Sequence, residues 1–215
     1  MKSVDAGDHT PGDASAKVND VRQAVMQLLE SHRPATTREE SAKERFLVEM
    51  DRLDRPCDEE ADVTHVTASA IVVGPRGTVL HRHKRLARMM QPGGHIDAGE
   101  SPEAAAAREA VEELGLSVAH PKLGPLLVHV DVHEAALGHT HLDLRYLVAG
   151  DNVDPRPPPG ESPDASWFSW EEARELVDPG LADALATARK VCEDLGSVNP
   201  EWWSDALGSA AKGEP

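Results

Sequence analysis

Long hydrophobic runs and cysteine are scarce in this sequence of 215 residues. No run of about 18 apolar residues occurs, so no membrane-spanning helix is predicted. The first 16 residues are rich in Asp, Gly, Ser and Pro and lack an apolar segment, which argues against a secretory signal. The two cysteines, Cys57 and Cys192, have no metal-binding spacing. Together these absences favour a reduced, cytoplasmic setting.

Positive charge is also scarce, with 22 Lys and Arg against 38 Asp and Glu and a formal net charge of -16. This excess of negative charge disfavours a surface that binds along a long nucleic acid. A small anionic substrate stays compatible if a local basic patch or a bound metal reverses the field. One such segment, residues 76–96, has no acidic residue and contains Arg76, Arg82, Lys84, Arg85 and Arg88. We expect Arg82 and Arg85 to contact phosphate, the alternative being a solvated loop.

The chain divides into four segments by composition and periodicity. Residues 17–62 are predicted to form two helices and a linker, because apolar residues recur at helical spacing and Pro34 interrupts them. Thr36 and Glu39 predict a capping box for the second helix. This extension is expected to pack on the main domain, with a regulatory role or homodimerisation as the alternative. The segments are a disordered N-terminus (1–16), a helical extension with linker (17–62), the main domain (63–197) and a C-terminal tail (198–215).

The most informative segment is a predicted helix that ends near Leu116. Ser101 suits an N-cap, Pro102 suits the first helical position, and Gly115 suits a left-handed C-terminal cap. Three carboxylates fall at positions i, i+3 and i+4 and so share one face, namely Glu109, Glu112 and Glu113. Like charges repel there, and a hard divalent cation with oxygen ligands such as Mg²⁺ would relieve the repulsion.

The spacing around this helix resembles the Nudix box, a glycine, five residues, Glu, seven residues and then Arg-Glu-U-x-Glu-Glu-x-Gly-U, where U is a bulky aliphatic residue. The positions that match are Gly94, Glu100, Arg108, Glu109, Glu112, Glu113, Gly115 and Leu116. Ala110 departs from the pattern because it is smaller than the usual Ile, Leu or Val. It is expected to face the core, so the departure concerns packing more than chemistry.

The resemblance to Nudix hydrolases implies an α/β fold, a Nudix-type α/β/α sandwich with a mixed sheet, here preceded by an N-terminal pair of helices. It implies hydrolysis of a diphosphate bond in a nucleoside diphosphate linked to another group, with Mg²⁺ or Mn²⁺ as cofactor. The implied metal ligands are Glu109, Glu112, Glu113 and the Gly93 carbonyl. Arg108 and Glu100 would pair and fix the helix against the preceding loop. The proton acceptor would be one of the glutamates or a carboxylate outside the box, such as Asp143 or Glu161.

Two alternative functions agree less well with the sequence. A module that senses a nucleotide without cleaving it would be expected to lack a box glutamate, whereas all are present here. A Nudix-like isoprenoid-diphosphate isomerase would be expected to have a cysteine near the first strands or the glycine loop, and neither Cys57 nor Cys192 is so placed. The sequence does not specify a base or a sugar, so the substrate is predicted only as a small phosphorylated compound of the nucleotide type.

Two later segments, residues 126–133 and 140–148, alternate as paired strands do. Each places polar side chains on one face, namely His129, Asp131 and His133 on the first and His139, His141, Asp143 and Arg145 on the second. Imidazole suits zinc, but we expect a polar sheet face that lines the substrate cleft. The candidate substrate-binding residues are His139, His141 and Asp143.

Overall fold

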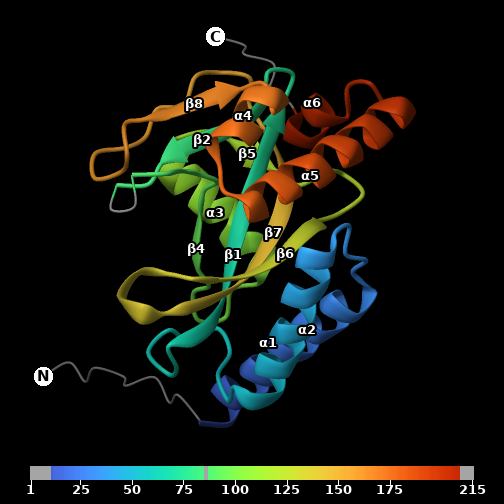
Figure 1. Cartoon of the computed structure of the whole chain (residues 1–215). Coiled ribbons are helices and arrows are strands. Elements are labelled where there is room, and N and C mark those ends of the chain that lie inside the picture. Colours follow the sequence, from blue (N-terminus) through green and yellow to red (C-terminus); the bar gives the residue numbers. More distant parts are fainter. Residues whose placement is uncertain (1–10, 85–86, 209–215) are drawn as a thin grey trace, which may run out of the picture.

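The computed structural model describes residues 11–84 and 87–208, which fold around one eight-stranded mixed sheet (Figure 1). The strands are β1 (Thr64–Gly74), β2 (Gly77–Arg82), β3 (Met89–Met90), β4 (Gly93–His95), β5 (Val118–Ala119), β6 (Leu126–Glu134), β7 (Thr140–Gly150) and β8 (Ala165–Phe168). The helices are α1 (Pro11–Ser31), α2 (Thr37–Arg52), α3 (Pro102–Leu114), α4 (Trp170–Leu176), α5 (Pro179–Val198) and α6 (Trp202–Leu207), with a short 3₁₀ helix η1 (Ala136–Gly138). Within the described ranges, none of the helices is long and apolar enough to cross a membrane.

The centre of the sheet is the parallel pair β1 and β7, in register from Thr64 beside Thr140 to Val73 beside Ala149. Parallel neighbours need a long crossover connection, and the chain between β1 and β7 supplies it together with α3. Strands β2 and β4 pair antiparallel with β1, whereas β5 and β6 pair antiparallel with β7. The outer strands β3 and β8 both pair with β2. The mixed sheet predicted from the sequence is confirmed.

Side chains alternate across β1, and each face of the sheet has its own apolar core. Val66 and Ala68 belong to a core that contains α3, α2 and the even positions of β7. Ile71 and Val73 belong to a second core, formed with α4 and α5. Helices α3 and α5 accordingly lie on opposite sides of the β1–β7 pair (Figure 1). The chain is an α/β/α sandwich, as predicted.

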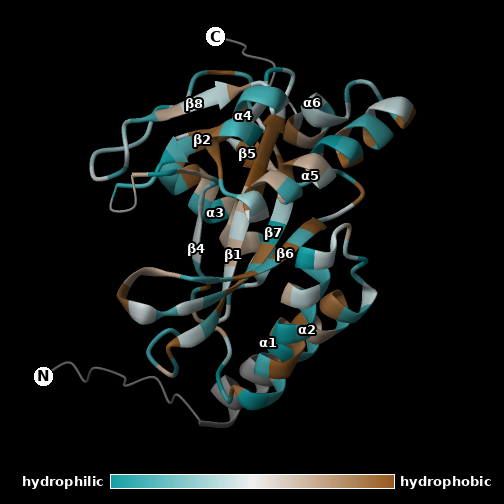
Figure 2. Cartoon of the chain, in the orientation of Figure 1, coloured by the Kyte–Doolittle hydropathy of each residue, from teal (hydrophilic) through white to brown (hydrophobic). Residues whose placement is uncertain are grey.

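The face of β1 toward α5 is apolar over only half of its length. His65, Thr67 and Ser69 occupy the other half of that face, opposite His141, Asp143 and Arg145 of β7. β6 continues the polar rows, because His129, Asp131 and His133 pair with Arg145, Asp143 and His141. Figure 2 shows β1 brown toward one end and paler toward the other. The polar side chains of β1, β6 and β7 therefore lie side by side on one face of the sheet, and His139 of the predicted set lies just before β7.

The N-terminal helices pack on the sandwich beside β6 (Figure 1). Val25 and Leu29 of α1 and Phe46 and Met50 of α2 are buried in the core shared with α3. Helix α1 begins at Pro11, earlier than the start predicted at residue 17. Proline is favoured in a first helical turn, and the alanines that follow are strong helix formers. Residues 1–10 and 209–215 lie outside the described residues.

The helix caps are complete to different degrees. Ser169 and Glu172 make a complete capping box at α4, and Gly115 ends α3 with a φ of 62°. Ser101 stands at the N-cap of α3 but its side chain makes no capping hydrogen bond. Thr36 accepts the Glu39 N–H at 3.2 Å, as expected.

The Glu39 side chain does not close the predicted box. It accepts the Ala35 N–H at 2.7 Å, lies 2.6 Å from the His32 ring, and accepts the Val130 N–H of β6 at 3.2 Å. The carboxylate is fully buried, so these partners replace the water that it loses. Glu39 thereby ties both N-terminal helices to the sheet.

Candidate functional site

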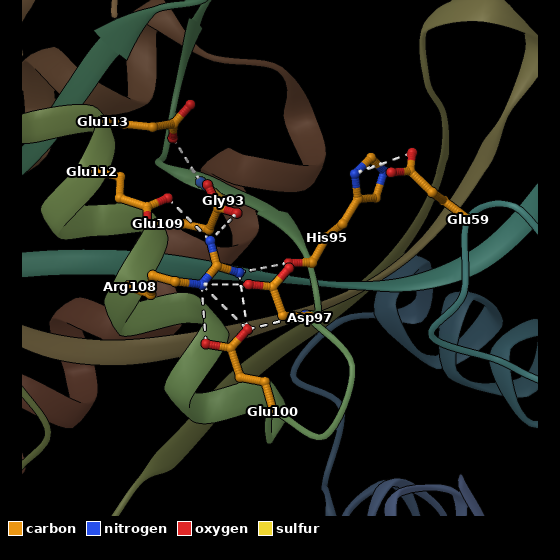
Figure 3. A network of polar contacts seen from close by, with 9 residues as sticks. All are labelled: Glu59, Gly93, His95, Asp97, Glu100, Arg108, Glu109, Glu112 and Glu113. Atoms are coloured by element: carbon orange, nitrogen blue, oxygen red, sulfur yellow. Dashed lines mark hydrogen bonds and ion pairs between the residues drawn. The ribbon is translucent and has the colours of Figure 1, made fainter. Parts of the chain in front are cut away.

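Arg108 on α3 organises the acidic face of the helix (Figure 3). Its Nε donates to Glu100 Oε1 at 3.0 Å, and its Nη2 donates to the His95 carbonyl at 2.9 Å. Its Nη1 donates to Glu109 at 2.8 Å and to Glu112 at 3.1 Å. The expected pairing of Arg108 with Glu100 is present, and the Arg108 charge lowers the pKa of Glu100 below its usual value. The sequence did not predict that the same guanidinium also reaches two of the three box carboxylates.

Glu113, the third carboxylate, turns to the β4 backbone instead. Its Oε2 accepts the Gly93 N–H at 2.9 Å. A side chain on Gly93 would not fit, because its Cβ would lie 2.3 Å from Ser69 Oγ and 2.7 Å from Ser69 Cα. Glycine at this position therefore lets β4 pass closely between β1 and the end of α3.

Negative charge on this face is only partly compensated. Burial, together with the neighbouring carboxylates of Glu109, Glu161 and Glu112, raises the pKa of Glu113 to about 7. Burial also raises the pKa of Glu109, although Arg108 opposes the shift. His81 Nε2 lies 3.8 Å from Glu113, but burial lowers the pKa of His81 and so disfavours its charged form.

The residues fit a hard divalent cation. Glu113 and Glu109 lie beside the glycines of β4, Glu112 shares their helix face, and oxygen donors are the ligands that Mg²⁺ and Mn²⁺ prefer. The surroundings of Glu113 disfavour its ionised form, and a nearby cation would favour that form instead. Of the ligands predicted from the sequence, Glu113 contacts Gly93, whereas Glu109 and Glu112 are held by Arg108.

A cavity of about 480 Å³ adjoins this face. Gly93, Gly94 and Glu113 contribute to one wall, and the polar half of the sheet contributes to another. The predicted residues His139, His141 and Asp143 all line the cavity. Among the described lining residues, six are carboxylates (Glu59, Glu113, Asp131, Glu134, Asp143 and Asp178) and three are arginines (Arg38, Arg88 and Arg145).

Asp143 and Arg145 form a buried ion pair in the floor of this cavity. Arg145 Nε donates to Asp143 at 2.9 Å and its Nη2 donates to Asp131 at 2.8 Å. Ser69 Oγ donates to Asp143 at 2.8 Å. Burial would raise the pKa of Asp131, but the His133 ring and the Arg145 charge lower it well below its usual range. Asp143 therefore holds Arg145 and Ser69 in place in the cavity floor. Its carboxylate is less open to a ligand than the sequence suggested.

Histidines cluster where β1, β4 and β7 approach the cavity. The His65 ring centroid lies 4.9 Å from that of His95, 5.1 Å from that of His141 and 5.2 Å from that of His139. Burial lowers the pKa of His65, and burial with the neighbouring His133 and His65 lowers the pKa of His141 to about 4. These two rings are therefore neutral near pH 7.

The basic segment is placed differently from the expectation. Arg82 Nη1 donates to the Ala87 carbonyl at 3.0 Å, its Nε lies 3.6 Å from Asp164, and it is not among the described lining residues. Arg85 lies outside the described residues. Arg88 lines the cavity instead.

Sequence reasoning missed the lining residues that come from other elements. Arg38 comes from α2 and Glu59 from the linker, and Asp178 stands at the start of α5. Each lies far from the box in the chain and has no motif around it. No local signal marked them, because only the packing of α2 and α5 on the sheet brings them to the cavity.

Comparison with known proteins agrees with this geometry. The model of the NUDIX domain family matches residues 63–189, which is more than half of the chain. The crystal structure of a NUDIX-family hydrolase from Clostridium perfringens is 29% identical, with a TM-score of 0.51, over 61% of this chain and 97% of that one. A C. elegans Ap4A hydrolase binary complex shares the fold at 17% identity, with a TM-score of 0.51, over 60% of this chain and 98% of that one.

The chain belongs to the NUDIX family. It is an enzyme of the hydrolase class, a pyrophosphohydrolase of a nucleoside diphosphate derivative.

Proposed function

We propose that this enzyme cleaves the diphosphate bond of a nucleotide-type substrate with Mg²⁺, for which Mn²⁺ substitutes. Glu109, Glu112 and Glu113 with the Gly93 carbonyl would hold the ion. When bound, the ion polarises phosphate oxygens and lowers the pKa of a coordinated water. Arg108 positions two of the carboxylates and, through Glu100 and the His95 carbonyl, holds α3 against the glycine loop.

The environment of Glu113 is the observation that supports this proposal best. Its carboxylate borders the cavity, is bound by the Gly93 N–H, and has two other acidic side chains of α3 near it. The raised pKa means that the folded state bears a penalty for its charge. A cation beside the Glu113 carboxylate would remove this penalty. Among the described residues, no Lys or Arg side chain forms an ion pair with Glu113.

The cavity suits a phosphorylated small molecule once a cation is present. Its volume of about 480 Å³ is in the range of ordinary small-molecule sites. Its described lining has more carboxylates than arginines, so a bare diphosphate would be repelled. Arg38 and Arg88 supply positive charge at the wall, and His139 supplies a ring nitrogen for hydrogen bonding.

The proton acceptor lies either among the α3 glutamates or just outside them. Asp143 is the poorer external candidate, because it is buried and bound to Arg145 and Ser69. Glu161 is the better one, because it is 38% exposed and close enough to raise the pKa of Glu113. Its Oε2 lies 3.7 Å from Lys84 Nζ.

A substrate screen tests the proposal. Nucleoside triphosphates, ADP-ribose, dinucleoside polyphosphates and nucleotide sugars would be incubated with metal-free protein, with and without millimolar Mg²⁺, and phosphate-containing products would be quantified. We expect hydrolysis of at least one class only when the ion is present. Binding of a nucleotide with no product under either condition would favour a sensing module and contradict the proposal.

The cysteines give no support to an isomerase. Burial raises the pKa of both Cys57 and Cys192 to about 12, so neither is a thiolate near neutral pH. Neither is among the described residues that line the cavity. The cytoplasmic setting and a homodimer remain predictions.

A further inference from the structure

Three histidines from three strands converge outside the acidic face of α3. One ring nitrogen each of His65, His95 and His141 lies within 4.8 Å of the others. The pairing of β1 with β7 sets His65 directly beside His141, and the pairing of β1 with β4 sets His95 beside Thr67 on the same face. These positions are far apart in the chain, so the cluster is a product of sheet topology.

Two of the three rings are held in the orientation that a metal ligand needs. His65 Nδ1 lies 3.2 Å from the Asp62 carbonyl, and His95 Nδ1 lies 3.3 Å from Glu59 Oε2 (Figure 3). Both acceptors favour a proton on Nδ1, which leaves the lone pair on Nε2. The Nε2 atoms of His65 and His95 are buried and have no hydrogen-bond partner among the described residues. A ligating histidine typically donates its other N–H to a carboxylate or a backbone carbonyl in this way.

We propose that His65, His95 and His141 form a second metal site, which takes a divalent transition-metal ion with Zn²⁺ as the preferred one. Neutral imidazole suits Zn²⁺, whereas Mg²⁺ prefers the oxygens of α3. At a Zn–N distance of about 2.0–2.1 Å in a tetrahedron, ligand nitrogens lie roughly 3.4 Å apart. From the observed separation of up to 4.8 Å, the nitrogens would have to approach one another by up to about 1.4 Å when the ion binds.

The site has an open side. Three protein ligands leave one tetrahedral position free, which is the pattern of zinc sites that bind water or substrate. His95 and His141 both line the cavity, so the free position faces it. The ion would also give the unpartnered Nε2 atoms of His65 and His95 a partner and join β1, β4 and β7.

The histidine site is separate from the proposed Mg²⁺ site. Figure 3 shows the His95 ring beside Glu59 and apart from the carboxylates of Glu112 and Glu113. The experiment on the histidine site measures Zn²⁺ binding, whereas the experiment on the proposed function measures hydrolysis. A negative result in one experiment therefore does not decide the other.

Titration of the metal-free full-length protein with Zn²⁺ tests the inference. We expect one equivalent to bind with a dissociation constant below about 1 μM and to raise the melting temperature, also in the presence of millimolar Mg²⁺. Co²⁺ should bind with the intense visible absorption of tetrahedral coordination. Absence of stoichiometric Zn²⁺ binding at about 10 μM would overturn the proposal.

Variants locate the ion. His95→Gln and His141→Gln should weaken Zn²⁺ binding at least tenfold and abolish the Co²⁺ band, and Glu59→Gln should weaken it by about tenfold through the lost orienting contact. Glu112→Gln and Glu113→Gln should bind Zn²⁺ within twofold of the unsubstituted protein. His95 is 41% exposed and so tolerates substitution better than buried His65. Unchanged Zn²⁺ affinity in folded His95→Gln and His141→Gln, or its loss in Glu113→Gln, would place the ion elsewhere.

Discussion

A Cβ atom on Gly94 would lie 2.5 Å from Oε1 of Glu109, so the β4 backbone and this α3 carboxylate leave no room for a side chain. The contact is with the far end of a flexible side chain. Gly94→Ala should therefore fold, with the free energy of unfolding changed by about 1 kcal/mol or less, because Glu109 can rotate away. The displaced carboxylate should lower kcat/KM at least tenfold and weaken Mn²⁺ binding.

Alanine substitutions at two other glycines serve as comparisons for Gly94→Ala. Gly93→Ala places its Cβ against Ser69 Cα, a backbone atom that cannot rotate away, so it should lose stability as well as activity. Gly196→Ala in α5 meets no atom within 4 Å and should be neutral or slightly stabilising, since alanine favours helix. Melting curves and kcat/KM for the three variants separate these cases. Unchanged activity in Gly94→Ala would remove Glu109 from the site.

Removal of one α3 charge is the direct test of the metal ligands. Glu112→Gln and Glu113→Gln preserve shape and helix propensity, and without metal they should be no less stable, because repulsion falls. Hydrolysis should fall by roughly 10²–10³-fold, as when one transition-state stabiliser is deleted. Glu103→Gln, in the first turn of α3, is the matched control and should cost little. Survival of activity within a few-fold in both variants would show that the ion does not sit on this helix face.

Metal binding should appear as stability. Mg²⁺ at a hundredfold excess over its dissociation constant should stabilise the folded state by about 2.7 kcal/mol. Thermal melts of chelator-treated protein with and without the ion measure this shift, and Glu113→Gln should reduce it. An unchanged midpoint at millimolar Mg²⁺, together with no Mn²⁺ binding, would count against the site.

Stability should also depend on pH through His129. Burial and the Arg145 charge lower its folded pKa to about 4, and neither ring nitrogen has a hydrogen-bond partner among the described residues. An unfolded histidine titrates near 6.5, so the unfolded state alone takes up the proton between pH 6.5 and 4. This contribution is fully present above pH 6.5 and is lost as the pH falls, by up to about 3 kcal/mol.

A substitution without an ionisable ring isolates the effect. Between pH 6.5 and 4, the unfolding free energy of His129→Leu should fall less steeply with decreasing pH than that of the unsubstituted protein. The difference in slope should correspond to the uptake of up to about one proton on unfolding, and denaturant melts across that pH range measure it. An identical slope in the two proteins would show that His129 titrates normally in the folded state.

Because Asp143 forms a buried ion pair, we expect its substitution to lower stability, which the loss of a substrate contact alone would not do. Asp143→Ala leaves Arg145 with Asp131 as its remaining ion-pair partner among the described residues, so we expect a loss of about 3 kcal/mol in unfolding free energy. His139→Ala, on the cavity wall, should lower turnover with little change in melting temperature. Comparable stability of Asp143→Ala and the unsubstituted protein would contradict the floor assignment.

The sequence by itself determined the acidic face of α3, because the spacing of residues along one helix is local. Glu109, Glu112 and Glu113 share a face by helical geometry alone, and only the N-cap and the first turns of α3 separate Glu100 from Arg108. The strand face with His141 and Asp143 was also predictable, because side chains alternate along any strand.

Only the tertiary structure decided what that face does. The parallel register of β1 and β7 joins His65 to His141, and the burial of Asp143 commits it to Arg145. Arg38 reaches the cavity because α2 packs on β6. Such contacts depend on which strand lies beside which and on the docking of distant helices, and neither is written in the spacing of neighbouring residues.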